Sequence, residues 1–228
     1  MKKDYEAERE KTLKSYSARQ LKNLKILMHA CCAPCATACV ERLVFELTCA
    51  CADYDLSNLT VYFYNPNMDG ENEYERRLFE LKRFLNEAYG AKIGLIAEKY
   101  DGKEFYDAVK GFEKCPEGGE RCEKCFGLRL EKTAFAAAKN GFDYICTTLT
   151  VSPHKNAEIL NETGVFAAEK FGVKWLYCDF KKKNGFLRST ELSQKYGLYR
   201  QNYCGCVYSK IEAADRCKGK TPDGCKEK

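Results

Sequence analysis

Short apolar runs alternate with longer amphipathic stretches along most of the chain. Runs rich in apolar and aromatic residues predict strands at 25–28, 60–64, 92–97, 144–147 and 174–177. The stretches between them have helical periodicity and predict helices at 36–47, 73–89, about 104–109, 122–139 and 156–171. This alternation predicts an α/β fold, in which a doubly wound, mostly parallel sheet has helices on both faces. Ligands bind such sheets at the carboxyl ends of the strands.

The alternating region is flanked by two polar ends. Residues 4–21 are polar nearly all round, so we expect a solvated helix within a charged extension over 1–24. Residues 25–216 are expected to form a single catalytic domain, whose helical and loop segment from about residue 181 folds back to bring its cysteines to the sheet. Residues 217–228 are expected to be a flexible tail.

Composition narrows the class of protein. With 45% apolar and 31% charged residues in 228, the chain is too apolar for disorder. The first 25 residues lack the apolar core of a signal peptide, and no later run approaches the roughly 20 apolar residues of a membrane span, so we expect a cytoplasmic protein without a membrane partner. The net charge of +5 is compatible with a nucleic-acid partner and does not identify one.

The fifteen cysteines are the most unusual feature of the composition. An odd number in a cytoplasmic chain argues against a disulfide framework and favours metal ligands or redox centres. Cys31 and Cys32 follow the first strand at the start of a helix, where the helix dipole favours thiolates. Cys122 and Cys125 open another helix, one turn apart. Four such thiolates suit a tetrahedral zinc or an iron–sulfur cluster, and spacing alone does not choose between them.

Two further polar groups are candidates for chemistry. Cys204 and Cys206 are separated by one residue, so a disulfide between them would close a small strained ring that is readily reduced. Such a pair suits electron relay, and both thiols also remain candidates for metal ligands. Asp179 follows the last predicted strand and is a candidate proton donor, metal ligand or helix cap. Cys35 is close enough to the first pair to serve as an alternative ligand.

The cysteine motifs, together with three others, resemble those of the cobalamin-independent epoxyqueuosine reductases, the QueH family. The similarity covers about residues 25–209 and consists of six motifs in the family's order: HACCAPC at 29–35, YFYNPN at 62–67, ERCEKC at 120–125 with Arg129, TTLT at 147–150 followed by Ser152-Pro153, DFKK at 179–182 and LYRQNYCGC at 198–206. The resemblance implies a HUP-like α/β fold. It also implies reduction of the epoxide of epoxyqueuosine to queuosine at the wobble position of tRNA.

The resemblance further assigns roles to individual residues. By the family pattern, Cys31, Cys32, Cys122 and Cys125 would bind a 4Fe-4S cluster, and Cys204 with Cys206 would form a redox-active disulfide. A second iron, held in part by Cys204, Cys206 or Asp179, is compatible with this set. The partners implied are a tRNA carrying epoxyqueuosine at the anticodon and an electron donor that the sequence does not identify.

Three other interpretations share parts of this pattern. ATP-dependent tRNA thiolation enzymes have a related sheet, but they need a glycine-rich loop where this chain has Cys31-Cys32-Ala33-Pro34, so no ATP chemistry is expected. A zinc-stabilised RNA-binding module would use the same cysteines without catalysis. A thioredoxin-like dithiol oxidoreductase would use only Cys32-Ala33-Pro34-Cys35 and would leave the later pairs without a role.

Overall fold

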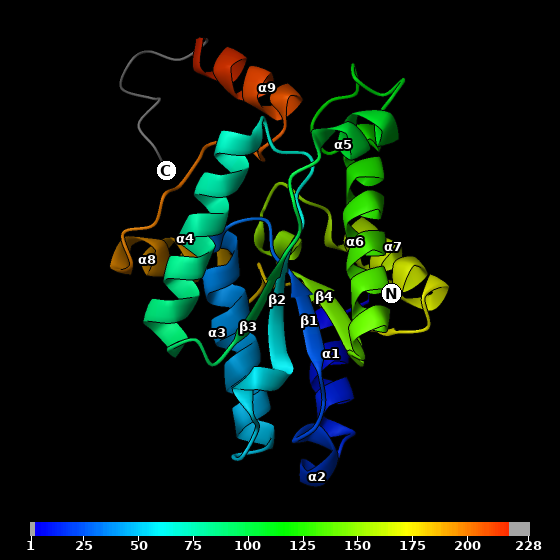
Figure 1. The fold of residues 1–228 in the computed structure, drawn as a ribbon, viewed down its shortest axis with the longest axis vertical. Helices are drawn as coiled ribbons and strands as arrows, with labels where there is room; N and C mark the ends of the chain where they lie inside the picture. Colours follow the sequence, from blue (N-terminus) through cyan, green and yellow to red (C-terminus); the bar gives the residue numbers. More distant parts are fainter. Residues whose placement is uncertain (1–2, 219–228) are drawn as a thin grey trace.

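The centre of the molecule is a five-stranded parallel sheet in the order β3-β2-β1-β4-β5. A computed structural model describes residues 3–218 (Figure 1). The strands are β1 Ile26–His29, β2 Leu59–Phe63, β3 Gly94–Ala97, β4 Tyr144–Thr147 and β5 Lys174–Trp175. Every pair of neighbouring strands is parallel. Strands β2 and β3 lie on one side of β1 and strands β4 and β5 on the other, so the strand order switches between β1 and β4. The carboxyl ends of all five strands therefore lie at one edge, as the sequence predicts.

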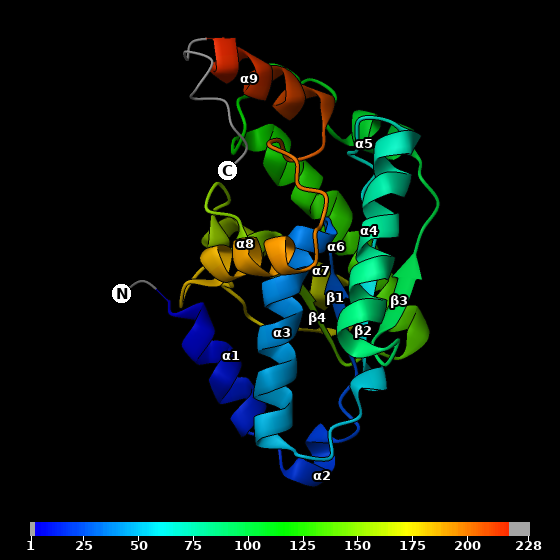
Figure 2. The same cartoon turned by 90° about the vertical axis from the view of Figure 1, so that its left-hand side faces the viewer.

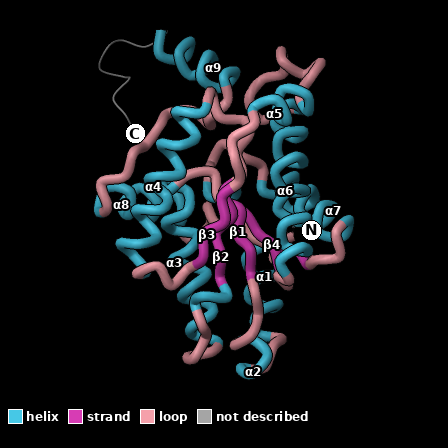
Figure 3. The backbone as a smooth tube through the Cα atoms, in the orientation of Figure 1, coloured by secondary structure: helices cyan, strands magenta, loops and turns pink. Residues whose placement is uncertain are grey.

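Helices cover both faces of the sheet. One face of the sheet is covered by α3 (Ala33–Ala50) and α4 (Glu71–Tyr89), which follow β1 and β2. Helices α1 (Tyr5–Lys14) and α8 (Gly185–Lys195) pack on the same side. The other face is covered by α6 (Glu120–Asn140) and α7 (Ala157–Lys170) (Figures 1 and 2). The remaining elements are α2 (Ala18–Leu21), α5 (Gly102–Ala108) and α9 (Val207–Lys218), and the 3-10 turns η1 (Leu56–Asn58) and η2 (Thr148–Val151). Figure 3 shows the strands enclosed between these layers. The predicted α/β class is confirmed.

The apolar pattern located most elements to within two residues, and the largest difference at a helix start has a local cause. Helix α3 was expected from residue 36 and begins at Ala33. Pro34 lies in its first turn, where the missing N–H costs nothing, and Cys32 is the N-cap residue. The helix thus begins directly after the cysteine pair, and its amino end faces the carboxyl edge of the sheet.

The expectation of a single solvated helix over residues 4–21 is wrong. The segment forms α1 and α2 separately, and α1 buries Glu6 and Arg9 at 3% and 0% exposure. Both side chains are paired: Arg9 binds Glu6 and also Glu46 of α3. Burial of charges is tolerated when they are paired and hydrogen-bonded, so a polar pattern can mark an ion-pair interface as well as a solvated face.

The carboxyl-terminal segment passes back across the molecule. After β5 the chain forms α8 beside α3, and α9 then lies beyond the carboxyl edge of the sheet (Figures 1 and 2). The expected tail over 217–228 lies outside the described residues from 219 onward.

A close contact between α7 and β5 limits which residues this interface accepts. A Cβ atom at Gly164 would lie 2.5 Å from ring atoms of Trp175, which is 7% exposed. Gly127 is also inside a helix, but a Cβ atom there would have no neighbour within 4 Å. The two glycines are thus a matched pair, of which one is required by packing.

We therefore expect Gly164→Ala to destabilise the protein by about 1–3 kcal/mol, because the added methyl overpacks the ring. Gly127→Ala should be neutral or stabilising by up to about 1 kcal/mol, because alanine favours helix. Urea unfolding followed by circular dichroism measures both. Equal effects at the two positions would contradict the packing seen between α7 and β5.

Candidate functional site

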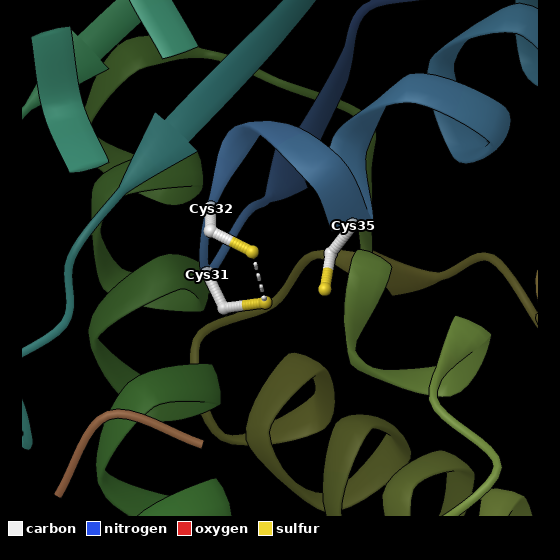
Figure 4. A group of neighbouring side chains, drawn as sticks. All are labelled: Cys31, Cys32 and Cys35. Carbon is white, nitrogen blue, oxygen red and sulfur yellow. Dashed lines mark hydrogen bonds between the residues drawn. The ribbon is translucent and has the colours of Figure 1, made fainter. Parts of the chain in front are cut away.

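Three cysteine thiols converge where β1 ends and α3 begins. The Sγ atoms of Cys31, Cys32 and Cys35 all lie within 4.8 Å of one another, and those of Cys31 and Cys32 are 3.8 Å apart (Figure 4). The two adjacent residues come from the loop after β1, and Cys35 comes from the first turn of α3, so the helix turns its thiol back toward the pair. Such a group has the donor chemistry of a site for a soft metal.

These three thiols differ in their affinity for protons. Hydrogen bonds from the Cys32 and Cys35 thiols, aided by the positive charges of Arg129 and Lys155, hold the pKa of Cys31 well below its usual value despite burial. The Cys31 thiolate in turn raises the pKa of Cys32 to about 12 and that of Cys35 well above its usual value. These shifts favour ionisation of Cys31 before Cys32 and Cys35, and binding a metal through more than one sulfur would release protons.

Helix α6 brings a second cysteine pair to the same region. Cys122 packs against the small apolar cluster that contains Cys31, Cys32 and Phe126. Cys125 lies one turn later, in a neighbouring cluster with Cys206. Gly118 donates its N–H to the Cys122 Sγ at 3.2 Å, and burial is the main cause that raises the pKa of Cys125 to about 12.

The predicted ligands are thus brought to one region without forming one tight group. Zn–S bonds of about 2.3 Å place the ligands of a single tetrahedral metal roughly 3.8 Å apart, as Cys31 and Cys32 are. The sulfurs of a polynuclear cluster lie further apart, because each binds a different iron. Within residues 3–218, the Cys122 and Cys125 sulfurs lie outside the 4.8 Å group. The separation of Cys31 and Cys32 therefore matches two ligands of one metal, with Cys35 as a third thiol in the same compact group.

The loop that carries Cys204 and Cys206 lies against this region and is fixed by α4. Arg77 is 1% exposed and donates from Nη1 to the Cys204 carbonyl at 3.1 Å. The Gly205 carbonyl accepts the N–H of Asp69 at 2.8 Å. Gly205 has a φ of +131°, a region that favours glycine, so it allows the two cysteines to flank a sharp turn. Both thiols are free in the structure.

A buried guanidinium lies beneath the cysteines. Arg129 of α6 is 0% exposed and donates to Asn65 Oδ1 at 2.6 Å, while its Nη1 lies 3.9 Å from the Cys125 Sγ. Burial and the Arg129 charge lower the pKa of neighbouring His29 to about 3, so that imidazole is neutral. Among the described residues Arg129 forms no ion pair with a carboxylate; burial acts to lower its pKa, but interaction with the nearby Cys125 and Cys31 sulfurs raises it.

Asp179 lies on the same edge, after β5. It is 6% exposed, and the Lys181 Nζ lies 2.9 Å from its Oδ1. Lys181 also donates to the carbonyl of Lys155. Burial acts to lower the pKa of Lys155, but interaction with the nearby cysteine sulfurs raises it. Lys181 therefore links the Asp179 carboxylate to the main chain at Lys155.

Sequence motifs located most of these residues but not their contacts. The motif around 120–129 contains Arg129, yet nothing in it shows that the guanidinium is buried among thiols. Arg77 lies in an amphipathic helix and Glu6 in a polar one, and neither has a local signal of a role at the site. Contacts between residues more than 100 positions apart depend on the folded chain, which local patterns do not report.

Nothing in residues 3–218 forms a helix that is both long and apolar enough to cross a bilayer.

Comparison with known proteins gives one consistent family. Residues 26–212 match the family model described as "Epoxyqueuosine reductase QueH". A protein of that name from Streptococcus pyogenes serotype M1 is 42% identical over 195 residues, which cover 83% of this chain and 72% of the relative. Its namesakes from Staphylococcus epidermidis and Thermotoga maritima are 39% and 33% identical, with 82% and 84% of this chain and 77% and 93% of the relatives covered.

The buried guanidinium generates a prediction for the metal-free protein. Because the Arg129 charge lowers the pKa of Cys31, Arg129→Met should move the midpoint of Cys31 alkylation to higher pH. Mass spectrometry of the peptide that contains Cys31, after timed reaction with iodoacetamide across a pH series, measures the midpoint.

Lys132→Met is the matched control, since Lys132 is a half-exposed cation on the same helix that pairs with Glu104. It should leave the midpoint unchanged. Equal shifts in the two variants would mean that general loss of charge, and not the buried guanidinium, sets the thiolate.

Proposed function

The chain belongs to the epoxyqueuosine reductase QueH family, and we propose that it reduces the epoxide of epoxyqueuosine in tRNA to the alkene of queuosine, the last step in making this nucleoside. The family match over 26–212 includes all the cysteines of the site. The observation that carries the proposal is the convergence of Cys31, Cys32 and Cys122 on one apolar cluster, with Cys125 and Cys206 in the next.

The reaction requires two electrons and two protons. An epoxide and two thiols give an alkene, one water and one disulfide: both C–O bonds break, one S–S bond forms, and the thiol protons leave with the oxygen. Cys204 and Cys206 are two free thiols on one loop, and they can supply this electron pair. An external electron donor must then return the disulfide to two thiols before the next turnover.

We assign the metal ligands of the site to Cys31, Cys32, Cys122 and Cys125. A 4Fe-4S cluster held by these thiolates would transfer electrons singly, which complements a dithiol that stores a pair. Arg129, Lys155 and Arg77 place positive charge beside the thiolates, and this charge favours binding of an anionic cluster. We propose that Asp179 relays one of the two thiol protons to the epoxide oxygen or helps to hold a second iron.

The ligand assignment predicts which cysteines the metal content depends on. Protein prepared without oxygen should contain about four irons and four sulfides per chain. Cys122→Ala/Cys125→Ala should lose most of both. Cys35→Ala should retain both, because Cys35 is the spare thiol of the compact group. Iron, acid-labile sulfide and zinc analyses with a visible spectrum measure the content.

Cys49→Ala controls for the loss of a thiol, because Cys49 is exposed on α3. The cluster would be contradicted if wild type contained one zinc and no iron, if Cys35→Ala lost that zinc, and if Cys122→Ala/Cys125→Ala kept it. That result would favour a single metal on Cys31, Cys32 and Cys35, as in a zinc-stabilised RNA-binding module.

The dithiol assignment predicts a separate loss. Cys204→Ser should keep its iron and lower turnover of epoxyqueuosine-tRNA under a chemical reductant by at least about 100-fold, because one thiol cannot supply an electron pair as a disulfide. Liquid chromatography of nucleosides from digested tRNA measures the product. Cys115→Ser is the control, because Cys115 is a half-buried thiol on the loop before α6. Full turnover in Cys204→Ser would exclude the dithiol and leave the cluster assignment intact.

A further inference from the structure

Helix α1 lies along the segment that follows β5, although about 170 residues separate them in sequence. The ring of Tyr5 stacks on that of Tyr177 with centroids 5.9 Å apart, and the Arg9 guanidinium lies 4.7 Å from the centroid of the Phe180 ring. Residues on successive turns of α1 thus contact residues on either side of Asp179. Figure 2 shows α1 beside α3, on the face of the sheet where this segment enters α8.

Glu6 is the residue of α1 that contacts the backbone of this segment. Its Oε1 accepts the N–H of Asp179 at 2.9 Å. Its Oε2 accepts hydrogen bonds from Arg9 at 2.7 Å and from Arg42 of α3 at 2.8 Å. At 3% exposure, the carboxylate is enclosed by these donors. Burial acts to raise the pKa of Glu6, but its bonds with Arg9 hold it below the usual value, so the group is ionised at neutral pH.

The N–H groups on either side of Asp179 are fixed by other elements. Cys178 donates to Asn161 Oδ1 at 3.0 Å, and Phe180 donates to Thr150 Oγ1 at 3.2 Å. Asn161 and Thr150 both lie within residues 26–212, which match the family, whereas Glu6 lies before them. The N–H of Asp179 itself is therefore held by a side chain from outside the matched region.

We propose that Glu6 is a positioning residue for Asp179, so that α1 is part of the reductase machinery of this chain. This inference rests on the proposed role of Asp179 in the reaction. A carboxyl group that must reach one oxygen of a bound substrate depends on where its main chain is held, and small displacements of a catalytic group reduce rates strongly. Glu6 fixes the main chain at Asp179, while Arg42 extends the same contact by donating to the Lys182 carbonyl at 2.9 Å.

Glu6→Asp is the informative substitution. It keeps the negative charge between Arg9 and Arg42, so that neither guanidinium is left unpaired, but it shortens the side chain by one methylene and withdraws it from Asp179. Glu10→Gln is the matched control, because Glu10 is on the same helix and forms a surface ion pair with Lys183 of the same segment without contacting Asp179.

The first measurement is hydrogen exchange of residues 177–183 in the metal-free protein. Glu6→Asp should increase exchange at the Asp179 amide, and Glu10→Gln should not. Equal exchange in Glu6→Asp and wild type would overturn the inference without any assay of turnover, because the hydrogen bond would then not hold this amide.

The second measurement separates positioning from general stability. In single-turnover reduction, Glu6→Asp should lower the rate constant about 10- to 100-fold, with KM for tRNA and iron content unchanged. Asp179→Asn should lower it about 100- to 10,000-fold and leave a measurable rate. Adding Glu6→Asp to Asp179→Asn should change the rate by less than about twofold, because Glu6 acts through the carboxyl that is already absent.

The outcomes distinguish the two levels of inference. Two results would overturn the role of Glu6 and leave the proposed function intact. One is a low rate in Asp179→Asn with an unchanged rate in Glu6→Asp. The other is that the losses from the two substitutions are independent and multiply in the double variant. Wild-type turnover in Asp179→Asn would overturn the roles of both residues. Absence of reductase activity in wild type would overturn the proposed function itself.

Discussion

The arrangement of the site depends on the cost of burying positive charge. Arg129 is fully buried, and interaction with the nearby Cys125 and Cys31 sulfurs favours its charged form although burial opposes it. A guanidinium in such a place is unfavourable unless polar or anionic groups accompany it, and the cysteine sulfurs and the Asn65 side chain surround it at the sheet edge. The lowered pKa of Cys31, the neutral His29 and the hydrogen bond to Asn65 all accord with a buried positive charge at this position. The protein thus prepares an environment for anionic ligands before any ligand binds.

Local sequence patterns predicted the framework of this site well. Strand β4 was located to the residue, and the cysteine loops after β1 and before α6 were placed at helix starts, because apolar runs and helix-start signals are properties of neighbouring residues. The sheet order then determines that the strand ends meet. The family resemblance supplied the proposed ligand set and the choice of iron, because composition and spacing leave zinc and iron open.

The parts that escaped prediction are those that depend on distant contacts. The polar residues of α1 were expected to face water, yet Glu6 and Arg9 are buried, because Arg42 and Glu46 of α3 complete their ion pairs. The pattern of polar positions along a helix cannot distinguish a solvent-exposed charged side chain from one buried in an ion pair with another helix. The closeness of Cys35 to Cys31 and Cys32, in contrast, was predicted from their spacing in sequence and is confirmed by the structure.

The only tryptophan of the chain, Trp175, is an intrinsic fluorescent probe of the region around β5. Trp175 donates its indole N–H to Asn161 Oδ1 at 2.8 Å, and the same oxygen accepts the N–H of Cys178 at 3.0 Å. Displacement of the residues before Asp179 therefore changes the polar environment of the indole. Intrinsic fluorescence at the red edge of excitation, where the other aromatic residues do not absorb, reports on this single locus without an introduced dye.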